Sequence, residues 1–107
     1  MHHRRGGATP VFTDTDLGTF CMEPAQIEAA IIERMAAVQS VYLYGQPAAM
    51  EQICEIVKKR NLWVGEDAAQ AQGGTLKGKQ VGRFGRWGMF SLCPTKNMTA
   101  GEGGMAW

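Results

Sequence analysis

Apolar residues recur at three- and four-residue spacing in two segments of the chain, which is the pattern of an amphipathic helix. The first segment runs from Pro24 to about Met35 and begins with a proline, a residue favoured at the first position of a helix. The second begins after Pro47 and ends at residues 58–60, whose three cations suit the negative end of a helix dipole. Asn61 follows and can take the left-handed conformation that ends many helices.

Three runs rich in β-branched and aromatic residues predict strands that alternate with these helices. They span residues 10–16, 38–43 and 62–65, and the last run continues into Glu66 and Asp67. The order β-α-β-α-β with short connections is typical of a parallel α/β sheet. Because a parallel sheet is buried on both faces and two helices are few to cover it, we expect exposed apolar sheet surface and self-association.

Six glycines lie between residues 72 and 88, and the alternation of helix and strand patterns ends there. The glycines predict turns that separate two brief strands, over residues 81–84 and 89–92. A polar loop follows these strands, and the last residues of the chain have the composition of the start of a further strand.

Two glycine patterns in this region fall short of nucleotide-binding motifs. Residues 73–79 have the spacing of a phosphate-binding loop, but Gln follows where that motif needs Ser or Thr. Gly82, Gly85 and Gly88 lack the spacing of a dinucleotide fingerprint and do not open a helix. These three glycines therefore predict a turn-rich hairpin.

The composition is that of one ordinary globular domain. The 107 residues are 45% hydrophobic and 20% charged, and no apolar run reaches the roughly 18 residues of a membrane span. No apolar stretch follows the basic amino-terminal residues, so we expect no secretory signal and a cytoplasmic protein. The three cysteines, Cys21, Cys54 and Cys93, form no paired spacing, and we expect reduced thiols with neither a disulfide scaffold nor a metal site.

The charges are distributed unevenly. Residues 1–67 carry six Lys or Arg against nine Asp or Glu, whereas residues 68–107 carry five against one. The net charge of +1 gives no reason to expect nucleic-acid binding. The second part of the chain, with its net charge of +4, suits an anionic ligand.

Polar residues that can carry chemistry follow two of the predicted strands. Asp67 ends an apolar strand, at the edge of a parallel sheet where ligands bind, and an unpaired carboxylate there needs a cationic partner. Gln70 lies three residues further on. Ser91 lies in a later strand, and Lys96 follows in a loop opened by Pro94, although a lone lysine in a loop is usually just solvated.

Five sequence blocks carry a family resemblance, and they occur in order along nearly the whole chain from Gly7 onward. The blocks span residues 7–12, 43–47, 66–71, 90–97 and 101–105. Together they resemble the central part of the sugar-nucleotide aminotransferases of the DegT type, a family of fold-type I enzymes that depend on pyridoxal 5′-phosphate (PLP). No single block is decisive, but five blocks in order make the likeness specific.

The resemblance implies a fold and an organisation. It implies a partial three-layer α/β/α large domain of the PLP-dependent transferases, with a mostly parallel sheet. Residues 1–6 are expected to be a disordered extension and residues 7–107 the central part of the PLP-binding large domain. The upstream segment and the small carboxy-terminal domain of that family are then absent, and the protein is expected to form a homo-oligomer.

The resemblance also implies a role for each candidate residue. Lys96 would form the internal aldimine with PLP and move a proton between substrate and cofactor. Asp67 would pair with the pyridine nitrogen, Ser91 would bind the phosphate, whose negative charge suits the cationic second part of the chain, and Gln70 would lie beside the cofactor. The resemblance implies a reaction that transfers an amino group, from glutamate, to a keto group of a nucleotide-linked deoxysugar in polysaccharide or antibiotic sugar biosynthesis.

Two features of the sequence bear on these roles. A dehydratase branch of the family has His in place of the lysine, so Lys96 argues against that branch. Many relatives have His where this chain has Tyr42, and the role of that position is open. Two other hypotheses remain: a truncated, inactive family member that serves as a structural or interaction module, and, less well supported, a generic nucleotide-binding α/β module.

Overall fold

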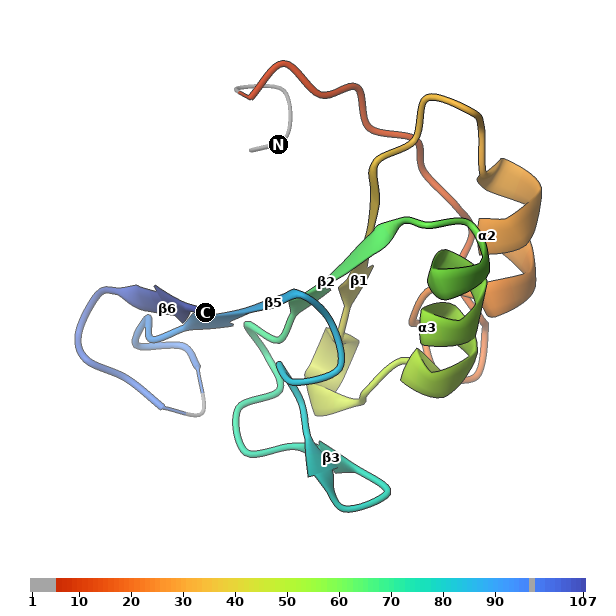
Figure 1. Cartoon of the computed structure of the whole chain (residues 1–107). Helices are drawn as coiled ribbons and strands as arrows, with labels where there is room; N and C mark the ends of the chain where they lie inside the picture. Colours follow the sequence, from red (N-terminus) through yellow and green to blue (C-terminus); the bar gives the residue numbers. More distant parts are fainter. Residues whose placement is uncertain (1–5, 97) are drawn as a thin grey trace.

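A four-stranded sheet with the order β1-β2-β5-β6 forms the centre of the chain (Figure 1). The computed structural model describes residues 6–96 and 98–107. Strands β1 (Ala37–Val41), β2 (Trp63–Asp67) and β5 (Trp87–Ser91) are parallel, and β6 (Gly104–Ala106) runs antiparallel to β5. The prediction of an α/β fold with a mostly parallel sheet is confirmed.

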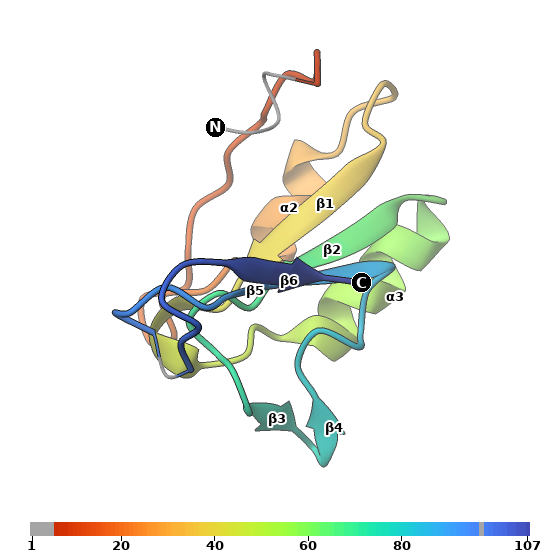
Figure 2. The same ribbon diagram turned by 90° about the vertical axis from the view of Figure 1, so that its left-hand side faces the viewer.

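Two helices, α2 (Pro24–Ala30) and α3 (Met50–Lys59), lie together on one side of this sheet (Figure 2). The short 3-10 helix η1 (Leu43–Gly45) links β1 to α3. Helix α3 connects two neighbouring parallel strands, as expected for a β-α-β unit. The core is formed by the apolar side chains of both helices and of the sheet face beneath them; it includes Ile27, Val38, Met50, Ile53, Val57 and Val64.

The other face of the sheet is open in the part of the chain that the structure describes. Val41 and Trp63, which alternate with the core positions of their strands, are 45% and 53% exposed. The guanidinium of Arg86 lies over the Trp63 ring at 4.0 Å from the ring centre. The predicted exposed apolar sheet surface is therefore confirmed, and the described helices form one layer against this sheet.

This open face leads us to expect self-association of the chain. Exposed apolar surface on a flat sheet tends to be buried against another molecule, because burial removes it from water. Sedimentation velocity should show species larger than a monomer, and Val41→Lys should shift the distribution toward the monomer, since it puts a charge on that face. A wild-type chain that sediments as a monomer at all concentrations would contradict this expectation.

Several predicted elements end elsewhere or do not form. Helix α2 ends at Ala30 rather than near Met35, because the backbone becomes extended at Ile31 and turns before it enters β1. Residues 10–16 form no strand; an isolated bridge joins Thr15 to Met22. A strand needs a neighbour for its backbone hydrogen bonds, and the alternating pattern alone does not supply one.

The glycine-rich region also differs from its prediction. Residues 81–84 form turns instead of a strand. A short antiparallel hairpin of β3 (Thr75–Leu76) and β4 (Lys79–Gln80) precedes them, and the sequence pattern did not predict it. The final strand is confirmed as β6. No helix in the described residues is long and apolar enough to cross a membrane.

Candidate active site

Two of the candidate residues lie at the same edge of the sheet. Asp67 ends β2 and Ser91 ends the neighbouring parallel strand β5. Asp67 pairs in register with Met89, two residues before Ser91. Since side chains alternate along a strand and register partners point to the same face, Asp67 and Ser91 both project to the open face of the sheet. The register therefore places Asp67 and Ser91 on one face, near the edge of the sheet where ligands are expected to bind.

Asp67 is held by backbone groups. Its Oδ1 accepts a hydrogen bond of 3.1 Å from the Ala69 N–H, and the Ala68 N–H donates to the carbonyl of Met89 at 2.9 Å. No lysine or arginine of residues 6–96 and 98–107 forms an ion pair with this carboxylate. The carboxylate is half-buried and fixed in position, so it can accept a hydrogen bond from a cationic group of a ligand.

Gln70 supports the turn that η1 forms. Its Oε1 accepts a hydrogen bond of 3.1 Å from the Tyr44 N–H. Tyr44 has a φ of 54°, a conformation that side-chain-bearing residues rarely adopt. Gln70 thereby stabilises a strained turn beside the sheet edge. Its amide NH2 makes no hydrogen bond with the described residues, which leaves it able to donate to a ligand.

Lys96 lies in the loop that follows Ser91. The loop is closed by hydrogen bonds from the Lys96 N–H to the Cys93 carbonyl, at 3.0 Å, and from the Ala100 N–H to the Leu92 carbonyl, at 2.9 Å. Gln72, which the sequence analysis did not single out, donates through Nε2 to the carbonyl oxygen of Ser91. The Lys96 side chain is half-buried and forms no ion pair within the described residues.

Among the described residues, the carboxylate that is fully buried is that of Glu66, whereas the residue types alone favoured Asp67. Glu66 is 0% exposed and lies on the helix side of β2. Its Oε2 accepts hydrogen bonds of 2.6 Å from the Tyr42 hydroxyl and the Gly82 N–H. Its Oε1 accepts from the N–H groups of Phe84, at 2.6 Å, and Gly85, at 2.5 Å. The signal in the sequence is alternation along the strand, because Glu66 lies two residues after the apolar Val64 and therefore shares its face.

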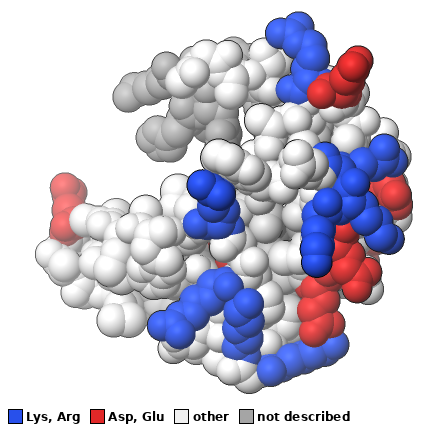
Figure 3. Space-filling model, in the orientation of Figure 1, with Lys and Arg blue, Asp and Glu red and all other residues white. Residues whose placement is uncertain are grey.

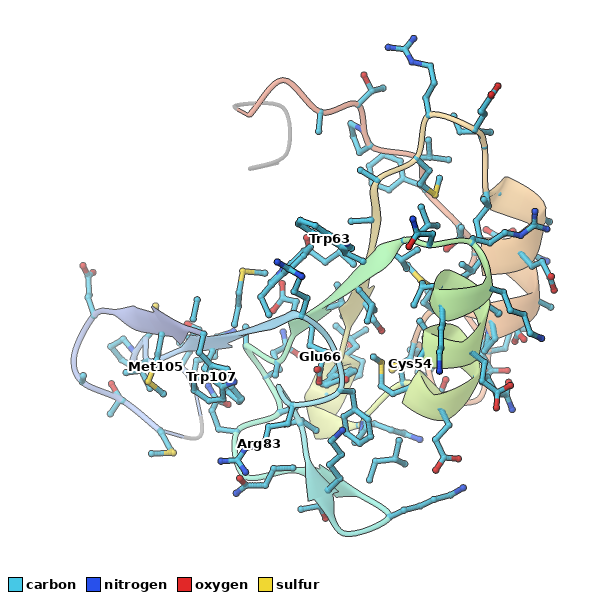
Figure 4. The ribbon with its side chains drawn as sticks, in the orientation of Figure 1. Cys54, Trp63, Glu66, Arg83, Met105 and Trp107 are labelled. Carbon is cyan, nitrogen blue, oxygen red and sulfur yellow. The ribbon has the colours of Figure 1, made fainter. Side chains whose placement is uncertain are left out.

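Burial and the Glu66 carboxylate raise the pKa values of two neighbouring groups. Burial and the hydrogen bond to Glu66 raise the pKa of the Tyr42 hydroxyl far above its ordinary value, so the hydroxyl remains a donor. Burial, with the charge of Glu66, also raises the pKa of the Cys54 thiol. The Cys54 thiol donates to the carbonyl of Phe84 at 3.7 Å. Figure 4 shows Cys54 on α3 beside Glu66.

Two of the three evenly spaced glycines lie in the turns of residues 81–86, and Gly88 lies in β5, which pairs with β2 and β6. The prediction that these glycines form a hairpin was therefore wrong. A Cβ added at Gly85 would lie 2.4 Å from the carbonyl oxygen of Val64, and one added at Gly88 would lie 2.7 Å from that of Gly82. Gly82 also has a φ of 82°, which favours glycine. The glycines allow the backbone of residues 81–86 to pack directly against β2.

Figure 3 shows the Lys and Arg side chains spread over several places on the face that it draws, rather than gathered in one patch. Lys77 pairs with Glu51 at 2.5 Å, Lys79 lies 4.7 Å from the Phe84 ring centre, and Arg86 covers Trp63. These residues precede β5, whereas Ser91 is at its other end. Lys96 is the cation that follows Ser91 in the sequence, and the role of the positive charge in binding an anion stays a prediction. The described residues contain no group of three His, Cys, Asp or Glu suited to a metal ion.

A model of the DegT/DnrJ/EryC1/StrS aminotransferase family matches residues 3–107. The chain is 52% identical over 102 residues to the pleiotropic regulatory protein of Geobacillus stearothermophilus. It is 50% identical over 99 residues to the GDP-perosamine synthase of Escherichia coli O157:H7. These matches cover 94% and 92% of this chain but 27% of each relative, so the chain spans about a quarter of the length of these curated relatives.

Solved structures of aminotransferases also match this chain. The aminotransferase of Psychrobacter cryohalolentis superposes with a TM-score of 0.95 at 43% identity, over 97% of this chain and 27% of that protein. Further solved structures that the chain matches hold the cofactor in its PLP or pyridoxamine phosphate form.

Proposed function

The chain belongs to the DegT/DnrJ/EryC1/StrS aminotransferase family, and we propose that it carries the central part of the PLP site of a sugar aminotransferase. The observation that carries this proposal is the shared edge and face of Asp67 and Ser91, with Gln70 and Lys96 in the loops that follow. The chain spans 27% of the length of these relatives, so the activity of the whole protein is part of the proposal.

The residues present fit PLP. The cofactor offers a pyridine nitrogen, an aldehyde and a phosphate, and the site offers a partner of matching chemistry for each. The Asp67 carboxylate is oriented by the Ala69 N–H and forms no ion pair with the described residues, so it suits a protonated nitrogen. The Lys96 amine suits the aldehyde, and the Ser91 hydroxyl suits the phosphate.

When bound, PLP supplies an electron sink that stabilises negative charge on the substrate carbon. The side chains of this chain would bind it and move the proton. Asp67 would keep the pyridine nitrogen protonated, which strengthens that sink. Lys96 would hold the cofactor through Nζ and, once released, take a proton at that atom from the substrate and return it to the cofactor. The Gln70 amide would donate a hydrogen bond to the cofactor.

The printed names of relatives, such as GDP-perosamine synthase, and the lysine at position 96 support a proposal for the substrates. A nucleotide-linked deoxysugar with a keto group would accept the amino group, and glutamate would donate it. Lysine at position 96 supports amino transfer over dehydration, because its primary amine would take the cofactor back and so release the aminated product, which an imidazole cannot do. The whole enzyme would act as a homo-oligomer whose other parts complete the sugar site.

Reductive trapping tests the proposed site. The chain is incubated with PLP, treated with borohydride to make the lysine–cofactor bond permanent, digested and analysed by mass spectrometry. We expect the label on Lys96, with Lys77 and Lys79 as internal controls, since Lys77 pairs with Glu51 and Lys79 lies over the Phe84 ring. No label, or equal label on all three lysines, would refute the site and favour the inactive module.

A further inference from the structure

We propose that Glu66 is a positioning residue for the cofactor site, because its carboxylate sets where β5 lies against β2. The inference rests on the proposed function. Glu66 does not touch the candidate site itself: its side chain projects to the helix side of β2, opposite to Asp67. Its effect would reach the site through the backbone of residues 81–86, which leads directly into β5.

The carboxylate is held by donors from two distant parts of the chain. Three backbone N–H groups of the loop, from Gly82, Phe84 and Gly85, point at its oxygens at 2.5–2.6 Å. The Tyr42 hydroxyl completes the set from the β1 side at 2.6 Å. No cation of the described residues pairs with Glu66, so these donors are what compensates for burying the charge. Figure 4 shows Glu66 between α3 and the loop that carries Arg83.

The direct pairing between β2 and β5 is short, and at its far end the Ala68 N–H donates a hydrogen bond of 2.9 Å to the Met89 carbonyl. The ladder between these strands spans three residue pairs, from Gly65–Trp87 to Asp67–Met89. It is preceded by one hydrogen bond, of 2.7 Å, from the Arg86 N–H to the Val64 carbonyl. If the loop moves away from Glu66, β5 can shift along or away from β2. Because Asp67 and Ser91 are set by this register, such a shift would misplace the partners of the pyridine nitrogen and of the phosphate relative to each other.

Glu66→Gln tests this role with little change in shape. The amide keeps one oxygen that can accept hydrogen bonds. Its NH2 group replaces the other oxygen and cannot accept a hydrogen bond from the N–H or O–H groups that face it. We expect amide hydrogen exchange at Gly82, Phe84 and Gly85 to become about tenfold faster or more. We also expect the Kd for PLP to rise about tenfold, and the visible circular dichroism of bound PLP to change.

Two variants serve as controls. Glu55→Gln makes the same chemical change on an exposed position of α3 and should leave both measurements unchanged. Ile27→Val trims the core under α2 and lowers stability without touching the loop. It should leave the Kd for PLP and the dichroism as in the wild type. This comparison separates positioning from a general loss of stability.

Each outcome decides the inference. Faster exchange in the loop with an unchanged Kd for PLP would overturn it, as would unchanged exchange. If the wild-type chain does not bind PLP at all, the proposed function fails together with this inference; if wild type and Glu66→Gln bind equally, only this inference fails.

Tyr42→Phe keeps the inference testable if Glu66→Gln does not fold. It removes one donor to Oε2 and leaves the three loop N–H groups in place. A smaller change of the same sign in loop exchange and in the Kd for PLP is expected, and loop exchange that rises without any change in Kd would overturn the role.

Discussion

Asp67→Asn is expected to raise the Kd of the chain for PLP on the order of 100-fold. The variant keeps the side-chain oxygen that accepts from the Ala69 N–H, so the turn after β2 should persist. It removes the negative charge, and with it a charge-assisted hydrogen bond to the protonated pyridine nitrogen. Such bonds contribute about 1.5–3 kcal/mol, the difference that the change in Kd reflects.

Absorbance titration with PLP measures this effect. Asp14→Asn is the matched control, because Asp14 is an exposed carboxylate outside the strand ends. It should bind PLP like the wild type. An Asp67→Asn chain with the affinity of the wild type would show that Asp67 does not face the pyridine nitrogen, even if Lys96 is still labelled by trapping.

Gly88→Ala is expected to lower the free energy of unfolding by about 3 kcal/mol or more. The added Cβ would lie 2.6–2.7 Å from the Cα and carbonyl oxygen of Gly82, which are backbone atoms and cannot rotate away. Gly82 in turn donates to Glu66, so relief of the clash would break that contact. A loss of this size is a large part of the about 5–15 kcal/mol that stabilises a typical domain.

Urea denaturation of Gly88→Ala and Gly78→Ala separates two possible causes. Gly78 has a φ of 80° but no atom within 4 Å of an added Cβ, so alanine there should cost about 1 kcal/mol of backbone strain. At Gly88 the backbone conformation suits any residue, but an added Cβ would clash with the backbone of Gly82. Equal losses in the two variants would show that the loop does not pack against the start of β5 as the structure describes.

Helix α3 shows what local pattern predicts well. Its buried positions Met50, Ile53 and Val57 lie on the predicted apolar stripe, and Lys58 and Lys59 occupy its last turn. Asn61 takes the left-handed conformation with a φ of 54°. These features depend on contacts within a few residues, so the sequence contains them directly. The strand expected over residues 10–16 failed for the opposite reason, because a strand depends on a partner elsewhere in the chain.

For the candidate site, too, local sequence features predicted some properties and left others open. The residue types of Asp67, Gln70, Ser91 and Lys96, with the blocks around them, were enough to predict the family that the comparisons confirm. Their roles stay predictions. The predicted parallel sheet also placed Asp67 at the edge where ligands bind, since ligands bind beyond the carboxyl ends of parallel strands.

The sequence by itself determined the class of fold, the family and the residue types available for chemistry, because these follow from local spacing and from motifs. Only the tertiary structure decided which carboxylate is buried. Glu66 and Asp67 are neighbours in the chain, yet alternation along β2 sends one into the core and the other to the open face. The tertiary structure also explained the glycines at 82, 85 and 88. They allow close backbone contacts with β2 and with one another, and no local pattern reveals these contacts.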